Sequence, residues 1–287
     1  MIRRLASRFS GLSKSRVCQL LGVSRALVYR RPNSRPERAE FYARLRDEIE
    51  SIVLYFTGYG YRRVAHALKR RGFIVGFKAV AKVMRENSLQ VHLKKRWVPT
   101  TDSDHGLKVY PNLAKAFVPQ APGELWVSDI AYTRLFRGFA FLAVVLDAFT
   151  HKAVGWELSS NLETGLCLRA LQKALESCPP KPGFIHHSDR GVQYASKAYT
   201  EAVLEAGGRL SMSAKGCPRD NAKAESFFKT LKTEEVHLQE YETMLELEAS
   251  LERYIGRVYN CERLHSSLGY LPPAEFEIQF LAAKTTA

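Results

Sequence analysis

The sequence lacks the cysteine pairs that form disulfide frameworks or zinc ribbons. Its five cysteines are an odd number, and no two of them form a Cys-x-x-Cys motif. A small disulfide-stabilised secreted domain and a zinc ribbon are therefore both disfavoured. We expect the cysteines to be reduced thiols of a cytoplasmic protein.

Long apolar runs are also missing. No stretch approaches the roughly 18 apolar residues that a membrane span requires, and the basic start MIRRLASRFS has no apolar segment of a secretory signal. No internal repeat and no long leucine heptad is visible either. The sequence thus predicts no membrane partner and no repeat architecture.

Acidic residues are scarce in the first part of the chain. Residues 1–110 contain 24 Lys and Arg against 8 Asp and Glu, whereas residues 111–287 contain 19 against 21. A basic segment beside a nearly neutral one is typical of a nucleic-acid-binding arm attached to a separate core. The length of 287 residues and the 46% hydrophobic content are sufficient for two or more domains with a sizeable core.

Two helix-turn-helix patterns lie in this basic part. In the first, a capped helix over Ser13–Gly22 is followed by a turn and by a second helix over Ser24–Arg31. In the second, Gly60–Gly72 places Tyr61, Val64, Ala65 and Leu68 on one face and is followed by a helix near Lys78–Glu86. A plain helical hairpin with a solvated basic face is the alternative for each. The side chains predicted to contact DNA here are Arg25, Arg30, Arg31, Arg62, Arg63, Lys69, Arg70, Lys94, Lys95 and Arg96.

Three carboxylates stand out in the remainder of the chain. Asp129 interrupts the strand pattern LWVSDIAYT, and Asp189 ends the apolar run of FIHHSDR. Glu225 falls in the first turn of a helix predicted over Ala222–Leu231, for which Asp220 or Asn221 would be the N-cap. There are 59 residues between the two aspartates and 35 between Asp189 and Glu225.

Two lysines follow Glu225 at helical spacing. Lys229 and Lys232 are at i+4 and i+7, so they share a helical face with the acid and are predicted to hold a DNA backbone. An ordinary solvated ion pair on a helix surface is the alternative.

The elements after residue 115 predict a mixed α/β sheet, because three strands are followed by alternating helices and strands. The predicted strands are Leu125–Leu135, Phe139–Phe149, Ala153–Ser159, Phe184–Asp189 and Arg209–Ser213, and the predicted helices are Leu162–Ser177, Ser196–Ala206, the Glu225 helix and Met244–Asn260.

The carboxylate spacing and the surrounding sequence resemble a known family. The segments WVSDIAYT, FLAVVLDAFTHKAVGW, HHSDRGVQYAS and YNCERLHSSLGYLPPAEFE are similar to the second-frame product, OrfB, of the insertion-sequence-three family, whose core carries the DDE triad of transposases and retroviral integrases. The resemblance covers nearly the whole chain, from about Cys18 to Phe276. It implies an RNase H-like mixed-sheet core preceded by an α-helical helix-turn-helix region. The implied segments are 1–35, a helix-turn-helix segment; 36–98, a second helix-turn-helix-like domain; 99–115, a linker; 116–240, the catalytic core; and 241–287, a helical extension.

The same resemblance implies an activity and its partners. Asp129, Asp189 and Glu225 would bind two Mg²⁺ ions, for which Mn²⁺ can substitute, and would catalyse 3′-end cleavage and strand transfer. The implied partners are double-stranded DNA, both the terminal inverted repeats and the target, a homo-oligomer on that DNA, and an upstream-frame OrfA protein or fusion. A DNA-binding regulator with an inactive core and a plain RNase H-like nuclease are the alternatives.

Other candidate sites in the core are less favoured. Asp147 also lies at a strand end, but in the family pattern it is a turn residue. His186 and His187 lack a third soft ligand for zinc, and no G-x-S-x-G motif surrounds Ser128 or Ser188.

Overall fold

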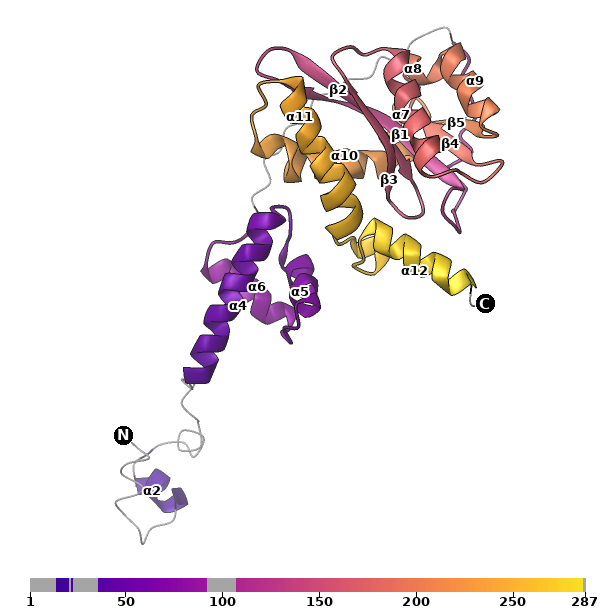
Figure 1. Cartoon of the computed structure of the whole chain (residues 1–287). Helices are drawn as coiled ribbons and strands as arrows, with labels where there is room; N and C mark the ends of the chain where they lie inside the picture. The colour runs from indigo at the N-terminus through magenta and orange to yellow at the C-terminus, as the bar shows by residue number, and fades with distance from the viewer. Residues whose placement is uncertain (1–13, 21, 23–35, 92–106, 286–287) are drawn as a thin grey trace. The chain divides into compact units, whose positions relative to one another are not determined.

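The computed structural model describes residues 14–20, 22, 36–91 and 107–285 (Figure 1). The chain divides into a first unit that ends at Glu50 and a second that begins at Ser51. The first unit contains α2 (Lys14–Leu20) and most of α4 (Pro36–Tyr55). The helix predicted over Ser24–Arg31 lies outside the described residues.

Helices α5 (Tyr61–Arg70) and α6 (Phe77–Glu86) form the helical pair that the second pattern predicts. Their buried side chains are Val64, Ala65, Leu68, Val80, Val83 and Met84. The turn between them includes Gly72 at φ 85°, a conformation that glycine adopts without steric cost. Of the four residues placed on one face of α5, Val64, Ala65 and Leu68 are buried, whereas Tyr61 at the first position of the helix is 38% exposed.

A five-stranded mixed sheet forms the centre of the second unit. The strands are β1 (Leu125–Arg134), β2 (Phe139–Asp147), β3 (Ala153–Ser159), β4 (Ile185–Ser188) and β5 (Arg209–Met212). Their order is β3-β2-β1-β4-β5, with β1, β2 and β3 antiparallel and β1, β4 and β5 parallel. This arrangement confirms the predicted mixed α/β sheet.

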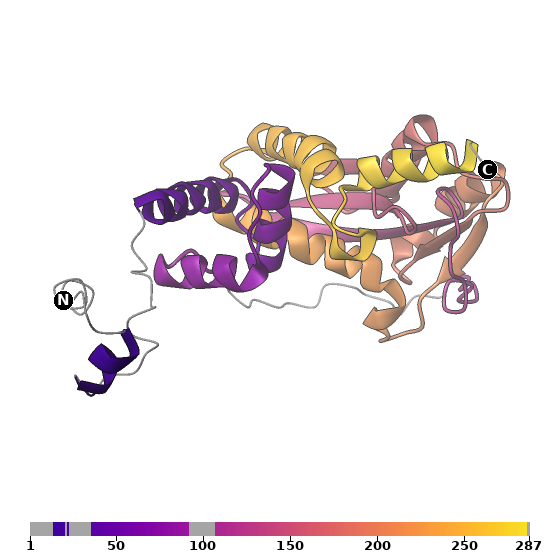
Figure 2. The same cartoon turned by 90° about the horizontal axis from the view of Figure 1, so that it is seen from below.

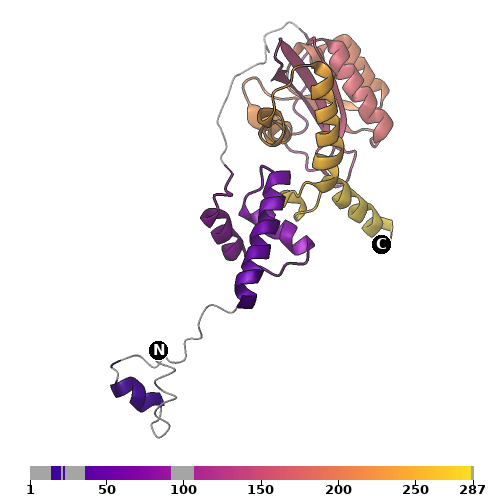
Figure 3. The ribbon, with the colours of Figure 1, turned by 60° about the vertical axis from the view of Figure 1, so that its left-hand side comes forward.

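Helices cover both faces of the sheet (Figures 1 and 3). On one face, Trp126 and Val145 pack with side chains of α7, α8 and α9; on the other, Val127 and Leu146 pack with side chains of α10, α11 and the π-helix η3. Alternation along each strand sends successive side chains to opposite faces, which explains why these neighbours belong to different cores. The bounds are α7 Thr164–Ser177, α8 Val192–Ala195, α9 Lys197–Glu205, α10 Ala222–Glu234, α11 Met244–Leu251 and η3 Glu252–Glu262.

Two predicted helices differ in detail from the observed ones. The helix predicted over Ser196–Ala206 is preceded by the short α8, and the two are separated by Ser196, which is extended and accepts a hydrogen bond from the Tyr199 amide at 3.4 Å. A serine N-cap of this kind starts a new helix because it satisfies an otherwise unpaired amide. The helix predicted over Met244–Asn260 continues beyond α11 as a π-helix.

The last helix, α12 (Pro273–Thr285), ends near the C-terminus (Figure 2). The rings of Phe276 and Phe280 lie 5.5 and 4.7 Å from the ring of Phe149, and Lys152 pairs with Glu277 at 2.7 Å. Part of this apolar C-terminal region therefore packs on its own chain. No helix among the described residues has the length and apolar character needed to cross a membrane.

Within the second unit, the segment before and along α5 contacts the C-terminal part of the chain. The Leu264 amide donates to the Tyr59 hydroxyl at 2.7 Å, and the His66 ring stacks on the Tyr270 ring at 3.6 Å. Arg70 forms two hydrogen bonds to Glu275, at 3.3 and 2.6 Å. The helical pair and the sheet core are thus joined by buried and exposed contacts alike.

Candidate active site

Asp129 lies within β1, and Asp189 is the first residue after the end of the neighbouring parallel strand β4. The register of β1 and β4 pairs Val127 with His187, and each aspartate follows two residues later along its own segment. The parallel pairing therefore brings the two acidic residues to neighbouring positions where β4 ends. Their backbone surroundings are similar: Asp129 accepts a hydrogen bond from the Ile130 amide and Asp189 one from the Gly191 amide, both at 2.9 Å.

Asn221 attaches the start of α10 to β1 beside these acids. Its side-chain amide donates to the Ser128 carbonyl at 3.1 Å, and its own side-chain oxygen is buried without a partner in the described structure. Asn221 occupies the N-cap position of α10, as predicted, but its side chain makes no capping hydrogen bond. The predicted helix around Glu225 is confirmed, with this acid in the first turn. Sequence reasoning missed the anchoring role because it depends on a residue 93 positions away.

The charges of Asp189 and Glu225 both act on the carboxyl group of Asp129. Desolvation, the charge of Asp189 and the charge of Glu225 raise the pKa of Asp129 to about 7, against the opposing effects of the Ile130 amide and of Lys232. Burial also raises the pKa of Glu225. Like charges in a poorly solvated region disfavour ionisation, so an apposed cation would stabilise this group of acids.

The lysines of α10 differ in their surroundings. Lys229 is exposed, whereas Lys232 is half-buried with its ammonium 5.3 Å from the centroid of the Tyr132 ring. Burial lowers the pKa of Lys232, and the charge of Asp129 raises it, so the ammonium and the carboxylate attract each other. Lys232 therefore partly offsets the mutual repulsion of the carboxylates.

Buried histidines and serines support the strand that leads to Asp189. The Ser128 and Tyr199 hydroxyls each lie 3.0 Å from His186 Nε2, and His187 lies 2.8 and 3.0 Å from the hydroxyls of Ser211 and Ser213. Burial lowers the pKa of His186 to about 3, so this imidazole is neutral. These contacts give both histidines a role in holding the strands together.

Asp147 is buried and organises the turn after β2. One carboxylate oxygen accepts hydrogen bonds from the amides of Phe149 and Thr150 and from the Thr150 hydroxyl, and the other accepts one from the Gly123 amide at 2.7 Å. These four bonds agree with its interpretation as a turn residue.

The predicted DNA-contacting residues of the helical pair have different surroundings. Arg62 and Lys69 are exposed on α5. Arg63 is partly buried, 4.0 Å from Glu234 and over the ring of Tyr59, and Arg70 is paired with Glu275. Their roles on DNA stay predictions. The residues Arg25, Arg30, Arg31, Lys94, Lys95 and Arg96 lie outside the described part of the chain.

The same carboxylates are the candidate ligands for a metal ion. Among the described residues, no three His, Cys, Asp or Glu side chains lie close enough together to coordinate a metal ion. The donor set nevertheless fits Mg²⁺ in its chemistry, because hard carboxylate oxygens are the ligands that this ion takes, few at a time and supplemented by water and phosphate. The raised pKa of Asp129 fits acids that repel one another when no cation lies between them.

Comparisons with known proteins agree with this geometry. Two family models described as "Integrase core domain" match residues 119–218 and 206–273, and one described as "HTH-like domain" matches residues 42–97. The transposase InsF of insertion sequence IS3A from Escherichia coli is 35% identical over 272 residues, which cover 93% of this chain and 94% of InsF. The chain belongs to the IS3 family of insertion-sequence transposases.

Other IS3-family relatives match over similar lengths. A protein of insertion element IS600 from Shigella sonnei is 36% identical over 92% of this chain and 98% of its own length, and the IS629 transposase of the same organism is 35% identical over 88% and 85%. Among solved structures, the HTLV-2 integrase catalytic core domain in complex with magnesium aligns with a TM-score of 0.43 at 12% identity, over 55% of this chain and 98% of that one.

The family membership confirms the predicted fold class and function. This IS3-family transposase has an RNase H-like integrase core preceded by a helix-turn-helix-like domain, and its core implies polynucleotidyl transfer on DNA.

Proposed function

We propose that Asp129, Asp189 and Glu225 act as one metal-binding catalytic unit that cleaves the 3′ ends of the element and joins them to target DNA. The observation that carries this proposal is the convergence of the three charges. Asp129 in β1 and Asp189 directly after β4 follow the paired residues Val127 and His187 at the same interval, and the charges of Asp189 and Glu225 both raise the pKa of Asp129. Acids whose pKa is raised by burial and by neighbouring acids are unfavourable for stability alone, so a role in chemistry is favoured.

The three carboxylates would hold two Mg²⁺ ions. Bound there, the ions supply activation of the attacking oxygen and stabilisation of the leaving oxygen of the phosphodiester. The chain's own part is to orient the acids: the amides of Ile130 and Gly191 fix the rotamers of the aspartates, and Asn221 holds α10 against β1. Lys229 and Lys232, on the Glu225 face of α10, would bind the DNA backbone next to the reacting phosphate.

Substrate recognition is assigned to the basic helical part. Segments 1–35 and 36–98 would bind the terminal inverted repeats, with 99–115 linking them to a core at 116–240 and an extension at 241–287. Because joining two ends requires two recognition surfaces, the active form on DNA would be at least a dimer. An upstream-frame OrfA protein, separate or fused, would supply the leucine-zipper contacts that are absent from this sequence.

A strand-transfer assay with pre-cleaved, labelled element ends and Mg²⁺ tests the carboxylate assignment. Asp129→Asn, Asp189→Asn and Glu225→Gln should each abolish cleavage and joining, because an amide keeps the shape but loses the charge that holds the ion. All three should bind end DNA about as well as the wild type. Glu201→Gln, an exposed acid that pairs with Lys197, is the control and should react normally.

The assignment would be abandoned if any one of the three variants joined ends at the wild-type rate in Mg²⁺. Loss of activity in the Glu201→Gln control would point to a general folding defect and would remove the support that the triad variants give.

A further inference from the structure

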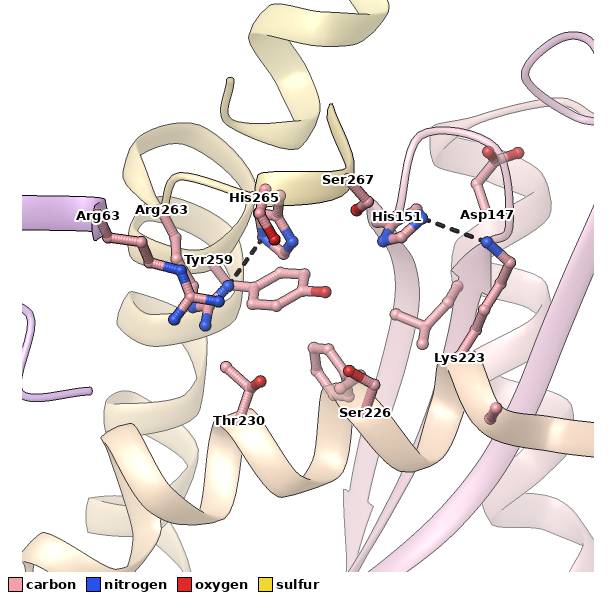
Figure 4. Close-up of a pocket in the computed structure, with 14 residues that line it drawn as sticks. Arg63, Asp147, His151, Lys223, Ser226, Thr230, Tyr259, Arg263, His265 and Ser267 are labelled. Carbon is pink, nitrogen blue, oxygen red and sulfur yellow. Dashed lines mark hydrogen bonds between the residues drawn. The ribbon is translucent and has the colours of Figure 1, made fainter. Parts of the chain in front are cut away.

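A second, cationic pocket lies on another side of the catalytic helix (Figure 4). Its α10 lining includes Lys223, Ser226 and Thr230, which recur at helical spacing along one stripe. At about 100° per residue, the centre of this stripe is roughly 110° around the helix from the stripe of Glu225 and Lys229. The pocket is therefore separate from the carboxylate site, although one helix contributes to both.

The charges around this pocket are mostly positive. Three of its lining side chains are cationic: Arg63 of α5, Lys223 of α10, and Arg263. Arg263 is already neutralised by two hydrogen bonds to Glu234 at 2.7 Å, whereas Arg63 lies 4.0 Å from the same carboxylate. Lys223 has its ammonium 3.2 Å from Nε2 of His151. Burial and the nearby Arg263 charge lower the pKa of Arg63, so an anion entering the pocket would be favoured by this arginine.

The acidic lining is smaller than the cationic lining, although the charge of Asp147 acts on Lys223 and raises its pKa against the effect of burial. Asp147 is the carboxylate among the lining residues, and its oxygens already accept four hydrogen bonds from the turn after β2. Burial lowers the pKa of His151 to about 4, and burial and the Arg263 charge lower that of His265 to about 2, so both rings are neutral hydrogen-bonding groups.

Hydroxyl groups complete the lining. Ser226, Thr230, Ser266 and Ser267 all face the pocket, and none of their hydroxyls hydrogen-bonds to another residue in the described part of the chain. Cations surrounded by free hydroxyl donors form the lining that recognises a phosphate group. The cavity volume of about 230 Å³ is below the roughly 300–1,000 Å³ of ordinary small-molecule pockets, which favours a single phosphate group over a whole nucleotide.

We propose that this pocket binds a backbone phosphate of DNA other than the one at the carboxylates. Arg63 belongs to the helix-turn-helix-like match and Lys223 to the integrase-core match, so DNA backbone bound in the pocket would contact residues of both matched regions. The proposal rests on DNA as the substrate of the family and is independent of the metal chemistry at Asp129, Asp189 and Glu225.

Equilibrium binding of the full chain to end DNA, in EDTA and over a range of salt concentrations, tests the proposal without any catalysis. Each lost phosphate contact lowers the slope of log K against log salt by about 0.9. Lys223→Gln should lower the slope by about one and weaken binding several-fold, and Lys223→Arg should restore both. Lys197→Gln, an exposed lysine on α9, is the matched control and should leave the slope unchanged.

A second pair of variants separates the effect of charge in the pocket from the effect of misfolding. Ser226 is exposed, so both Ser226→Asp and Ser226→Asn should be tolerated by the fold, but only the aspartate adds a negative charge to the pocket. Weaker DNA binding by Ser226→Asp than by Ser226→Asn supports the proposal. Equal slopes for wild type, Lys223→Gln and Ser226→Asp overturn it.

Adding inorganic phosphate distinguishes a pocket that binds free phosphate from one that binds a phosphate of the DNA backbone. If phosphate raises the melting temperature of the wild type but not of Lys223→Gln, while the DNA salt slopes are equal, the pocket takes free phosphate and its assignment to DNA is wrong. Because these readouts need no metal, inactive triad variants can be used throughout, and failure of the metal assignment would leave the result interpretable.

Discussion

Arg263 and Glu234 form a buried bidentate ion pair. Arg263 Nε lies 2.7 Å from one carboxylate oxygen of Glu234 and Nη2 lies 2.7 Å from the other, and the Tyr254 hydroxyl donates to the same carboxylate at 3.0 Å. Glu234 is the last residue of α10, the helix that carries Glu225 in its first turn. The pair thus holds the far end of the catalytic helix against the C-terminal segment.

Arg263→Ala should be strongly destabilising, because it leaves the Glu234 carboxylate buried with its charge uncompensated. We expect a loss of about 3–5 kcal/mol in the free energy of unfolding, measured by urea denaturation. Arg257→Ala is the control, since Arg257 pairs with Glu262 at the surface and should leave the midpoint nearly unchanged. Equal midpoints for the two variants would show that the buried pair is not important for stability.

Asp129→Asn should stabilise the metal-free protein at alkaline pH. The ordinary pKa of this carboxyl is 3.8 and the folded-state pKa is about 7, so its ionisation opposes folding progressively from pH 4 to pH 7 and fully above that. Removing the charge should raise the free energy of unfolding by on the order of 2 kcal/mol at pH 8 in EDTA and have little effect near pH 4.

Mg²⁺ provides the complementary measurement. An ion held by the carboxylates binds the folded state, so it should raise the melting temperature of the wild type and leave that of Asp129→Asn almost unaffected. A decrease in alkaline stability on Asp129→Asn, or equal Mg²⁺ shifts in both proteins, would contradict the electrostatic account of this site.

Asp147→Asn should lower stability without removing the chemistry. The new amide group would oppose at least one of the four donors that the carboxylate now satisfies, at a cost of about 1–3 kcal/mol. Thermal unfolding should show this loss, whereas strand transfer assayed well below the melting temperature should be retained. A folded but inactive Asp147→Asn protein would place this acid in the reaction after all.

Arg62→Gln should weaken binding to specific and random DNA by similar factors. Arg62 is exposed on α5, so it is available for a phosphate contact, which carries no base sequence information. We expect the salt slope to fall by about one unit for both DNAs. A change confined to the element ends would instead indicate that Arg62 reads bases.

The sequence by itself was sufficient for the family, for the order of the five strands, and for singling out three carboxylates as candidates. Local features carry this information: apolar alternation predicts strands, helical periodicity predicts α5 and α6, and an aspartate within or at the end of a buried strand is conspicuous because it is unfavourable there. The β3 bounds, Ala153–Ser159, are the same in the prediction and in the structure.

Only the tertiary structure decided which charged groups are partners. Arg62 and Arg63 are adjacent in sequence and equally basic, yet one is exposed and the other approaches Glu234, because successive helical positions point about 100° apart and only one direction meets the core. Asn221 likewise reads as a cap but binds the Ser128 carbonyl, and the pocket beside α10 gathers side chains from α5 to the C-terminal segment. Contacts between residues far apart in sequence arise from the packing of whole elements, which no local pattern encodes.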